Sequence, residues 1–307
     1  MNAEALSGAL AVCDLARRRP PLTAMGAIAA RLGVDDRAMH AIVRQVTDAP
    51  ASRSTVRSLK ADFVRLESGA ASAFERYALL TAAIVQLSSA PVALGSGVRR
   101  VMADRLRRLA ECPEHAPPSP VDVDSAAFVA LAKIVTSRRF PAGQFDWEPS
   151  GIPRSVLLRI PARRLPALVG FIAFRMGGFG PIMFSHLSQA RAQKSLDERE
   201  AKRSYFRMAK TLEVQPEMRG FAAWSWFRAP ATHAVSPHLA WLSTVFLENG
   251  GFVSDCGPDD PSHGALYRSA TRRRLYERGE YVPAKGLVLW PRRAMLRWAD
   301  RHPEFDD

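Results

Sequence analysis

Apolar residues return at helical spacing through the first third of the chain. Within residues 55–89 they recur every three or four positions, and residues 98–111 form a strongly basic amphipathic pattern. Residues 5–46 read as three shorter helices, interrupted at Pro20-Pro21 and at Gly33. These patterns predict a helical N-terminal module over residues 1–111.

Four prolines fall within residues 113–120, and proline removes the backbone N–H that a helix needs, so residues 112–124 are predicted to be a linker. Beyond it, apolar runs typical of strands alternate with helical patterns that end at glycines. The predicted helices are 125–136, 196–212, 238–248, 269–278 and 293–301. The predicted strands are 156–160, 221–227, 252–254 and 286–290, and residues 140–153 are expected to be a loop.

This order of elements predicts an α+β fold, in which the helical module is followed by a mixed α/β domain over residues 125–307 with βαβ units around a buried sheet. At 307 residues and 47% hydrophobic composition, the chain has enough apolar side chains for a substantial core. No internal repeat interrupts this organisation.

The charge balance indicates which kinds of molecule the chain is expected to bind. The 43 Lys and Arg residues outnumber the 30 Asp and Glu residues, which gives a formal net charge of +13 and favours nucleic acid, an anionic membrane face or a phosphorylated cofactor. The three cysteines lie far apart and have no zinc spacing, so a reducing compartment is expected. No secretory signal pattern or membrane-spanning run is expected, and the predicted location is the cytoplasm.

Residues Ile28, Ala29, Leu32, Gly33, Val34, Met39 and Ile42 stand at the spacing of a helix-turn-helix. The segment 28–42 resembles the corresponding segment of DNA-binding proteins, in which a small residue lets two helices cross and a glycine makes the turn. The resemblance implies that Arg37, His40 and Arg44 face the major groove. Two aspartates, Asp35 and Asp36, stand at the end that would approach the bases.

Ala270, Leu275, Tyr276, Glu277 and Gly279 carry a second resemblance, because they match a helix segment of the GNAT-superfamily acyltransferases. Residues 220–292 are similar to the cofactor-binding half of that family, which implies a GNAT-like fold that binds acyl-coenzyme A. In the family, the loop before the first helix wraps the pyrophosphate; the corresponding loop here, residues 229–237, has no glycine. The residues implied in cofactor binding are Arg228, His233, Ser236, Arg272 and Arg273.

The acyltransferase resemblance implies transfer of an acyl group from coenzyme A to an amine. Tyr276 would protonate the departing thiolate, and either His238 or Glu248 would accept the proton of the amine. A non-enzymatic nucleic-acid-binding or regulatory protein is the alternative, and an inactive acyltransferase fold kept as a scaffold is the third. The seven scattered histidines show no metal-ligand spacing, so no metal is expected.

Overall fold

The computed structural model describes residues 94–111, 134, 139–188, 196–261, 264–267 and 269–306. The chain divides into two compact units, of which the second comprises residues 94–97, 142–188 and 194–307. The predicted linker and most of the predicted N-terminal module lie outside the described residues. Within that module, α6 (Ser96–Glu111) confirms the basic helix expected at 98–111.

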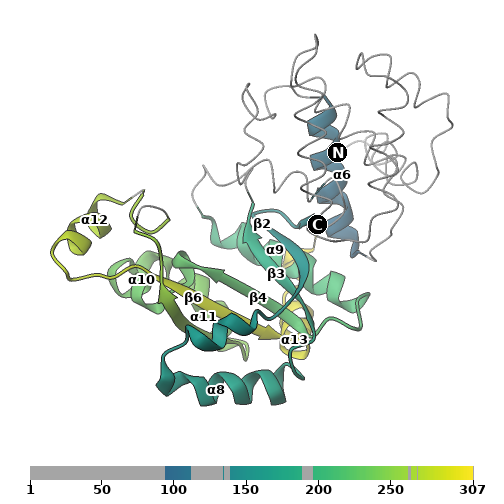
Figure 1. Cartoon of the computed structure of the whole chain (residues 1–307). Coiled ribbons are helices and arrows are strands. Elements are labelled where there is room, and N and C mark those ends of the chain that lie inside the picture. Colours follow the sequence, from purple (N-terminus) through teal and green to yellow (C-terminus); the bar gives the residue numbers. More distant parts are fainter. Residues whose placement is uncertain are drawn as a thin grey trace, which may run out of the picture. The chain divides into compact units, whose positions relative to one another are not determined.

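Six strands form one sheet in the order β1-β2-β3-β4-β6-β5 (Figure 1). Their bounds are β1 (Phe140–Pro141), β2 (Phe145–Gly151), β3 (Pro181–Leu187), β4 (Gly220–Ser225), β5 (Phe252–Pro258) and β6 (Ala284–Pro291). Strands β2 to β6 lie in the second unit, so this unit is a mixed α/β domain, as the sequence predicted.

The pairing of these strands differs from a simple series of βαβ units. β3 and β4 are parallel neighbours joined through α9 (Glu198–Glu213). β6 pairs antiparallel with both β4 and β5. It therefore separates the two strands, 221–227 and 252–254, that the sequence pattern suggested as successive members of one βαβ unit. The parallel crossover unit lies one step earlier, at β3-α9-β4.

The helices of the second unit are α8 (Leu165–Gly170), α9, α10 (Pro230–Val235), α11 (Trp241–Glu248), α12 (Ala270–Glu277) and α13 (Arg292–Asp300). Four of them, α9, α11, α12 and α13, confirm predicted helices with bounds that differ by up to three residues, whereas α8 and α10 were not predicted. Asp197 starts α9 by accepting a 2.8 Å hydrogen bond from the Glu200 amide, and Ser269 starts α12 in the same way through the Arg272 amide.

Two local predictions were wrong. Residues 140–153, expected as a loop, contain β1 and β2, because Phe145 to Trp147 are buried in the sheet despite the neighbouring Pro149 and Gly151. Residues 156–160, expected as a strand, belong mainly to the 3₁₀ helix η2 (Arg154–Leu158). Short apolar runs fit either structure, and here only Val156 and Ile160 turn inward.

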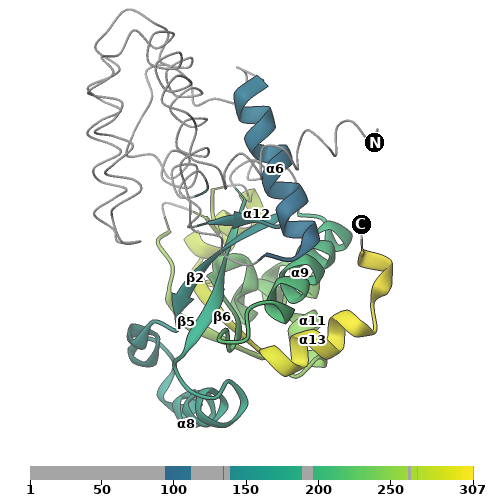
Figure 2. The same cartoon turned by 90° about the vertical axis from the view of Figure 1, so that its right-hand side faces the viewer.

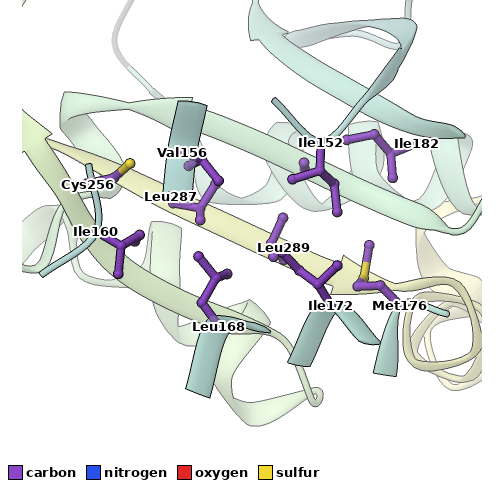
Figure 3. Packing of buried hydrophobic residues seen from close by; sticks show 11 residues of the cluster. Ile152, Val156, Ile160, Leu168, Ile172, Met176, Ile182, Cys256, Leu287 and Leu289 are labelled. Atoms are coloured by element: carbon purple, nitrogen blue, oxygen red, sulfur yellow. The ribbon is translucent and has the colours of Figure 1, made fainter. Parts of the chain in front are cut away.

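One face of the sheet is covered by η2 and α8 (Figure 1). Val156, Leu168 and Ile172 pack against Leu287 and Leu289 of β6 (Figure 3). These side chains form a continuous buried cluster together with Ile152, Ile160, Met176, Ile182, Ala222 and Cys256. Burial on this scale is the main source of stability for the sheet.

The opposite face carries α9, α11 and α13 (Figure 2) and a core of aromatic rings. Tyr205 of α9 lies edge-on to Phe246 of α11 at 5.2 Å and to Trp290 of β6 at 6.2 Å. Trp298 of α13 lies 5.3 Å from Trp290. Because helices cover both faces, the last six residues of β6 are all buried.

Gly286 fixes how the chain leaves β4. The backbone of Arg228 and Ala229 crosses β6 so closely at Gly286 that a Cβ atom there would overlap Arg228 C and O and Ala229 N. Glycine is required at this position because main chain, rather than a flexible side chain, occupies the space. The close crossing sets the position from which the Arg228 side chain projects.

Candidate functional site

The parallel ladder between β3 and β4 stops before either strand ends. Its last pair is Ser185 with Ala223, yet β3 continues to Leu187 beside β2, and β4 continues to Ser225 beside β6. We call these carboxyl ends, residues 185–187 and 223–225, the β3/β4 junction. Backbone groups that face across the junction have no ladder partner there, and ligands of α/β sheets commonly bind at such carboxyl ends.

Polar side chains without partners gather around this junction. Among the described residues, Ser185 Oγ, Ser225 Oγ and Trp224 Nε1 are buried atoms that form no hydrogen bond. Side chains alternate along a strand, so the two serines point to the α9 face while Trp224 packs on the other face with the η2 and α8 cluster. Buried polar groups are normally satisfied, so their concentration here marks a site that a ligand would complete.

Arg228 follows β4 directly, and its side chain, 1% exposed, lies among aromatic rings. Its guanidinium carbon is 4.9–5.7 Å from the ring centres of Phe145, Tyr205, Phe221, Phe227 and Phe246. These rings come from β2, α9, β4, the 3₁₀ helix η6 (Trp226–Arg228) and α11. The Arg228 guanidinium therefore lies on the α9 face, between the side chains of the two strand groups that separate at the junction.

No carboxylate partner compensates the charge of Arg228 in the described part of the chain. Its Nε and Nη1 atoms form no hydrogen bond. Burial lowers the pKa of Arg228, and the opposing influence comes from Tyr205. Burial raises the pKa of Tyr205, and the Arg228 guanidinium opposes that rise. Several kcal/mol are lost when a charge is buried without a counter-ion, and contacts with ring faces return only part of that cost.

On the other face of the junction, His186 and Glu148 form a pair. His186 Nε2 lies 3.2 Å from Glu148 Oε1, and their side chains are 28% and 19% exposed. Phe184 supports the imidazole at a ring distance of 5.2 Å. A carboxylate beside an imidazole orients the ring, and general acid–base catalysis uses such an arrangement. The exposed part of the ring lies elsewhere, because the His186 Nε2 atom that faces Glu148 is buried and forms no hydrogen bond with the described residues.

Two cations flank Trp224 on this same face. Arg159 lies 5.1 Å and Lys285 5.6 Å from the centre of the Trp224 ring. Lys285 also lies 3.6 Å from Asp259. Cys256 is buried beside these groups; burial raises its pKa to about 11, and the two cations oppose that shift. The thiol is therefore protonated and inert as a nucleophile, whereas the cations provide positive charge beside the junction.

The residues implied in cofactor binding fall into two groups. Arg228 is buried in its ring cage, and His233 Nε2 lies 3.0 Å from the Phe227 carbonyl. Ser236 and Arg272 meet directly, since Arg272 Nη1 donates a 3.0 Å hydrogen bond to Ser236 Oγ. Arg272 also donates to the Ala265 carbonyl and stacks on Trp226 at 4.8 Å. Arg273 is exposed. The contacts of Arg272 tie α12 to the rest of the unit, and phosphate binding by these residues stays a prediction.

The three predicted catalytic residues are spread over the surface. Tyr276 is 40% exposed on α12, His238 is exposed just before α11, and Glu248 is exposed at the far end of α11. The eight residues of α11 span about 12 Å, so His238 and Glu248 lie at opposite ends of one helix. Within the described residues, no hydrogen bond or ion pair joins any two of these three.

Arg37, His40 and Arg44, the predicted nucleic-acid contacts, lie outside the described residues. Among the residues that are described, no group of three or more His, Cys, Asp or Glu is placed to hold a metal ion. No helix in the described ranges is both long and apolar enough to cross a membrane.

The sequence patterns missed the junction for a definable reason. Ser185 and His186 belong to β3, which follows a glycine-rich segment and was not recognised as a strand. Trp224 and Ser225 belong to a recognised strand, but no site was assigned to them because no nucleophile motif surrounds Ser225. The Glu148–His186 contact joins β2 to β3 across more than thirty residues, so no local sequence pattern predicts it. The apolar run at residues 182–184, directly after the glycine-rich segment, was the available signal.

Comparison with known proteins identifies no relative: no family model, curated protein or solved structure matches the chain.

Proposed function

We propose that the second unit is an acyl-coenzyme A-dependent N-acyltransferase whose reaction takes place at the β3/β4 junction. The observation that carries this proposal is the parallel β3-α9-β4 unit, with a ladder that ends at Ser185 and Ala223 beside the partly buried His186–Glu148 pair. The acyltransferase resemblance shifts accordingly: α9, rather than the segment before α11, corresponds to the first helix of the cofactor-binding half.

In this proposal His186 is the catalytic base. The amine nitrogen attacks the thioester carbonyl, the C–N bond forms, the C–S bond breaks, and the amine proton passes to His186, whose charge Glu148 stabilises at 3.2 Å. Backbone amides freed by the end of the ladder are the donors available to the carbonyl oxygen. The departing thiolate takes up a proton from solvent, since Tyr276, the donor that the resemblance implied, lies on α12 and outside the shifted unit.

The phosphates of coenzyme A need cations. At the start of α9, the Asp197 carboxylate already accepts the Glu200 amide, and Glu198 and Glu200 add negative charge in the first turn. The helix N-terminus is therefore poorly suited to a pyrophosphate. Arg159 and Lys285, which flank Trp224 at the junction, are the cations we assign to the anionic part of the cofactor.

Two measurements test the proposal. Thermal unfolding with coenzyme A and acetyl-coenzyme A at one hundred times the dissociation constant should show about 2.7 kcal/mol of stabilisation. Release of the coenzyme A thiol should then be followed with a panel of amines. His186→Gln should lower kcat by a factor of about 10² to 10⁴, the usual contribution of a general base, with little change in cofactor binding.

His302→Gln is the matched control. His302 and Glu304 form an exposed pair at 2.8 Å near the end of the chain, so the same chemistry is removed away from the junction. This variant should turn over like the wild type. No stabilisation by either ligand at millimolar concentration, or equal loss of turnover in the two variants, would refute the proposal.

A further inference from the structure

Arg228 suggests which acyl group the junction accepts. The cation stands on the α9 face at the point where the two strand groups separate, with five aromatic rings around it and its Nε and Nη1 atoms without partners. A fold rarely retains a buried charge that nothing compensates, unless a bound group supplies the counter-charge. The polar group that opposes the lowered pKa of Arg228 is the phenol of Tyr205, which carries no counter-charge while it is protonated.

We propose that Arg228 binds the terminal carboxylate of the acyl group, so that the preferred donor is a dicarboxylic acyl-coenzyme A thioester. This inference rests on the proposed function. The hydroxyl groups of Ser185 and Ser225, which point to the same face and also lack partners, complete the hydrogen-bonding positions for the carboxylate.

The charge balance selects a carboxylate over a phosphate. One guanidinium surrounded by neutral hydroxyls and rings offers a single positive charge, which a singly charged anion neutralises and a phosphate dianion exceeds. A carboxylate is also planar, as the guanidinium is, and it fits between ring faces with two parallel hydrogen bonds. Arg159 and Lys285 lie on the other face of the sheet, where we assign them to the phosphates of the cofactor.

The test compares succinyl-coenzyme A with butyryl-coenzyme A. Both acyl groups have four carbons, and they differ in the terminal carboxylate. Dissociation constants should be measured for both thioesters and for acetyl-coenzyme A, with the full chain and with Arg228→Met, which keeps an apolar side chain of similar length. We expect the wild type to bind the succinyl thioester at least about ten-fold more tightly than the butyryl thioester. In Arg228→Met the preference should vanish while butyryl binding persists.

The arms of the experiment separate the two proposals. Binding of acetyl- and butyryl-coenzyme A without a preference for the succinyl thioester would overturn the Arg228 assignment and leave the acyltransferase proposal standing. A succinyl preference that Arg228→Met retains would also overturn the assignment. If none of the thioesters binds, the acyltransferase proposal falls and this inference falls with it. Should Arg228→Met fail to fold, the wild-type ratio of the two dissociation constants decides the question.

Discussion

Replacing Gly286 with alanine tests the close crossing that positions Arg228. The added Cβ would overlap main-chain atoms of Arg228 and Ala229, so the connection after β4 has to move away from β6. Overpacking a core destabilises the folded state by about 1–3 kcal/mol. We expect about 3 kcal/mol here, because the added Cβ meets main-chain atoms, which cannot turn aside as a flexible side chain can. Alanine also restricts the backbone of the unfolded chain more than glycine does, and this effect stabilises the folded state by up to about 1 kcal/mol. The net loss expected is about 2 kcal/mol, or roughly 4–8 °C in the unfolding midpoint.

Tryptophan fluorescence during urea unfolding is the appropriate assay, because all six tryptophans lie within the second unit. Gly170→Ala is the control, since Gly170 has helical backbone angles and nothing lies within 4 Å of the added methyl group. That substitution should be neutral or stabilise by up to about 1 kcal/mol. If Gly286→Ala were as stable as Gly170→Ala, the described crossing of β6 would be wrong.

Three further substitutions test other parts of the second unit. Leu289→Ala removes a fully buried side chain and should lower the free energy of unfolding in urea by about 2–5 kcal/mol. Leu158 is 90% exposed, so Leu158→Ala should change this free energy by no more than about 0.5 kcal/mol, and equal losses in the two variants would contradict the packing. Cys256, with its pKa raised to about 11, should resist alkylation at pH 8 in native protein whose other two cysteines are replaced by serine, and rapid labelling would contradict its burial. The pKa of this thiol is about 8.5 in the unfolded chain and is raised to about 11 in the folded protein. The free energy of unfolding should therefore fall as the pH rises from roughly 9 to 11, because only the unfolded thiol ionises in this range. Arg272→Met removes the hydrogen bonds of Arg272 and should lower the free energy of unfolding by about 1.5–3 kcal/mol. It should also speed amide hydrogen exchange in α12, and unchanged exchange would show that these contacts do not hold the helix.

Periodicity was sufficient for much of the second unit. The helices α9, α11, α12 and α13 and the strands β4 to β6 were visible because each ends at a glycine, a proline or a change of period, and β6 reads as a continuous apolar run. β2 and β3 were not visible. β2 contains proline and glycine, and β3 mixes apolar residues with Ser185 and His186, so neither matches a standard strand pattern.

The candidate site was less predictable than the fold. A cofactor role for Arg228 was predicted from the acyltransferase resemblance, but its ring cage draws on residues from β2 to α11 and depends on how the sheet closes. The Glu148–His186 pair likewise exists only because β2 and β3 are in register. Tyr276 matched a family segment, yet nothing in that segment determined how its helix would pack. Contacts between distant segments are the part of a site that local patterns do not contain.

The central place of β6 has a consequence for how the protein is made. Synthesis proceeds from the N-terminus, so β4 and β5 emerge well before residues 284–291, the strand that pairs with both. Until then, β5 has no ladder partner and one edge of β4 is bare; such edges pair readily with other chains. We therefore expect nascent chains stopped before residue 284 to aggregate or to recruit chaperones, and the sheet to close late in translation.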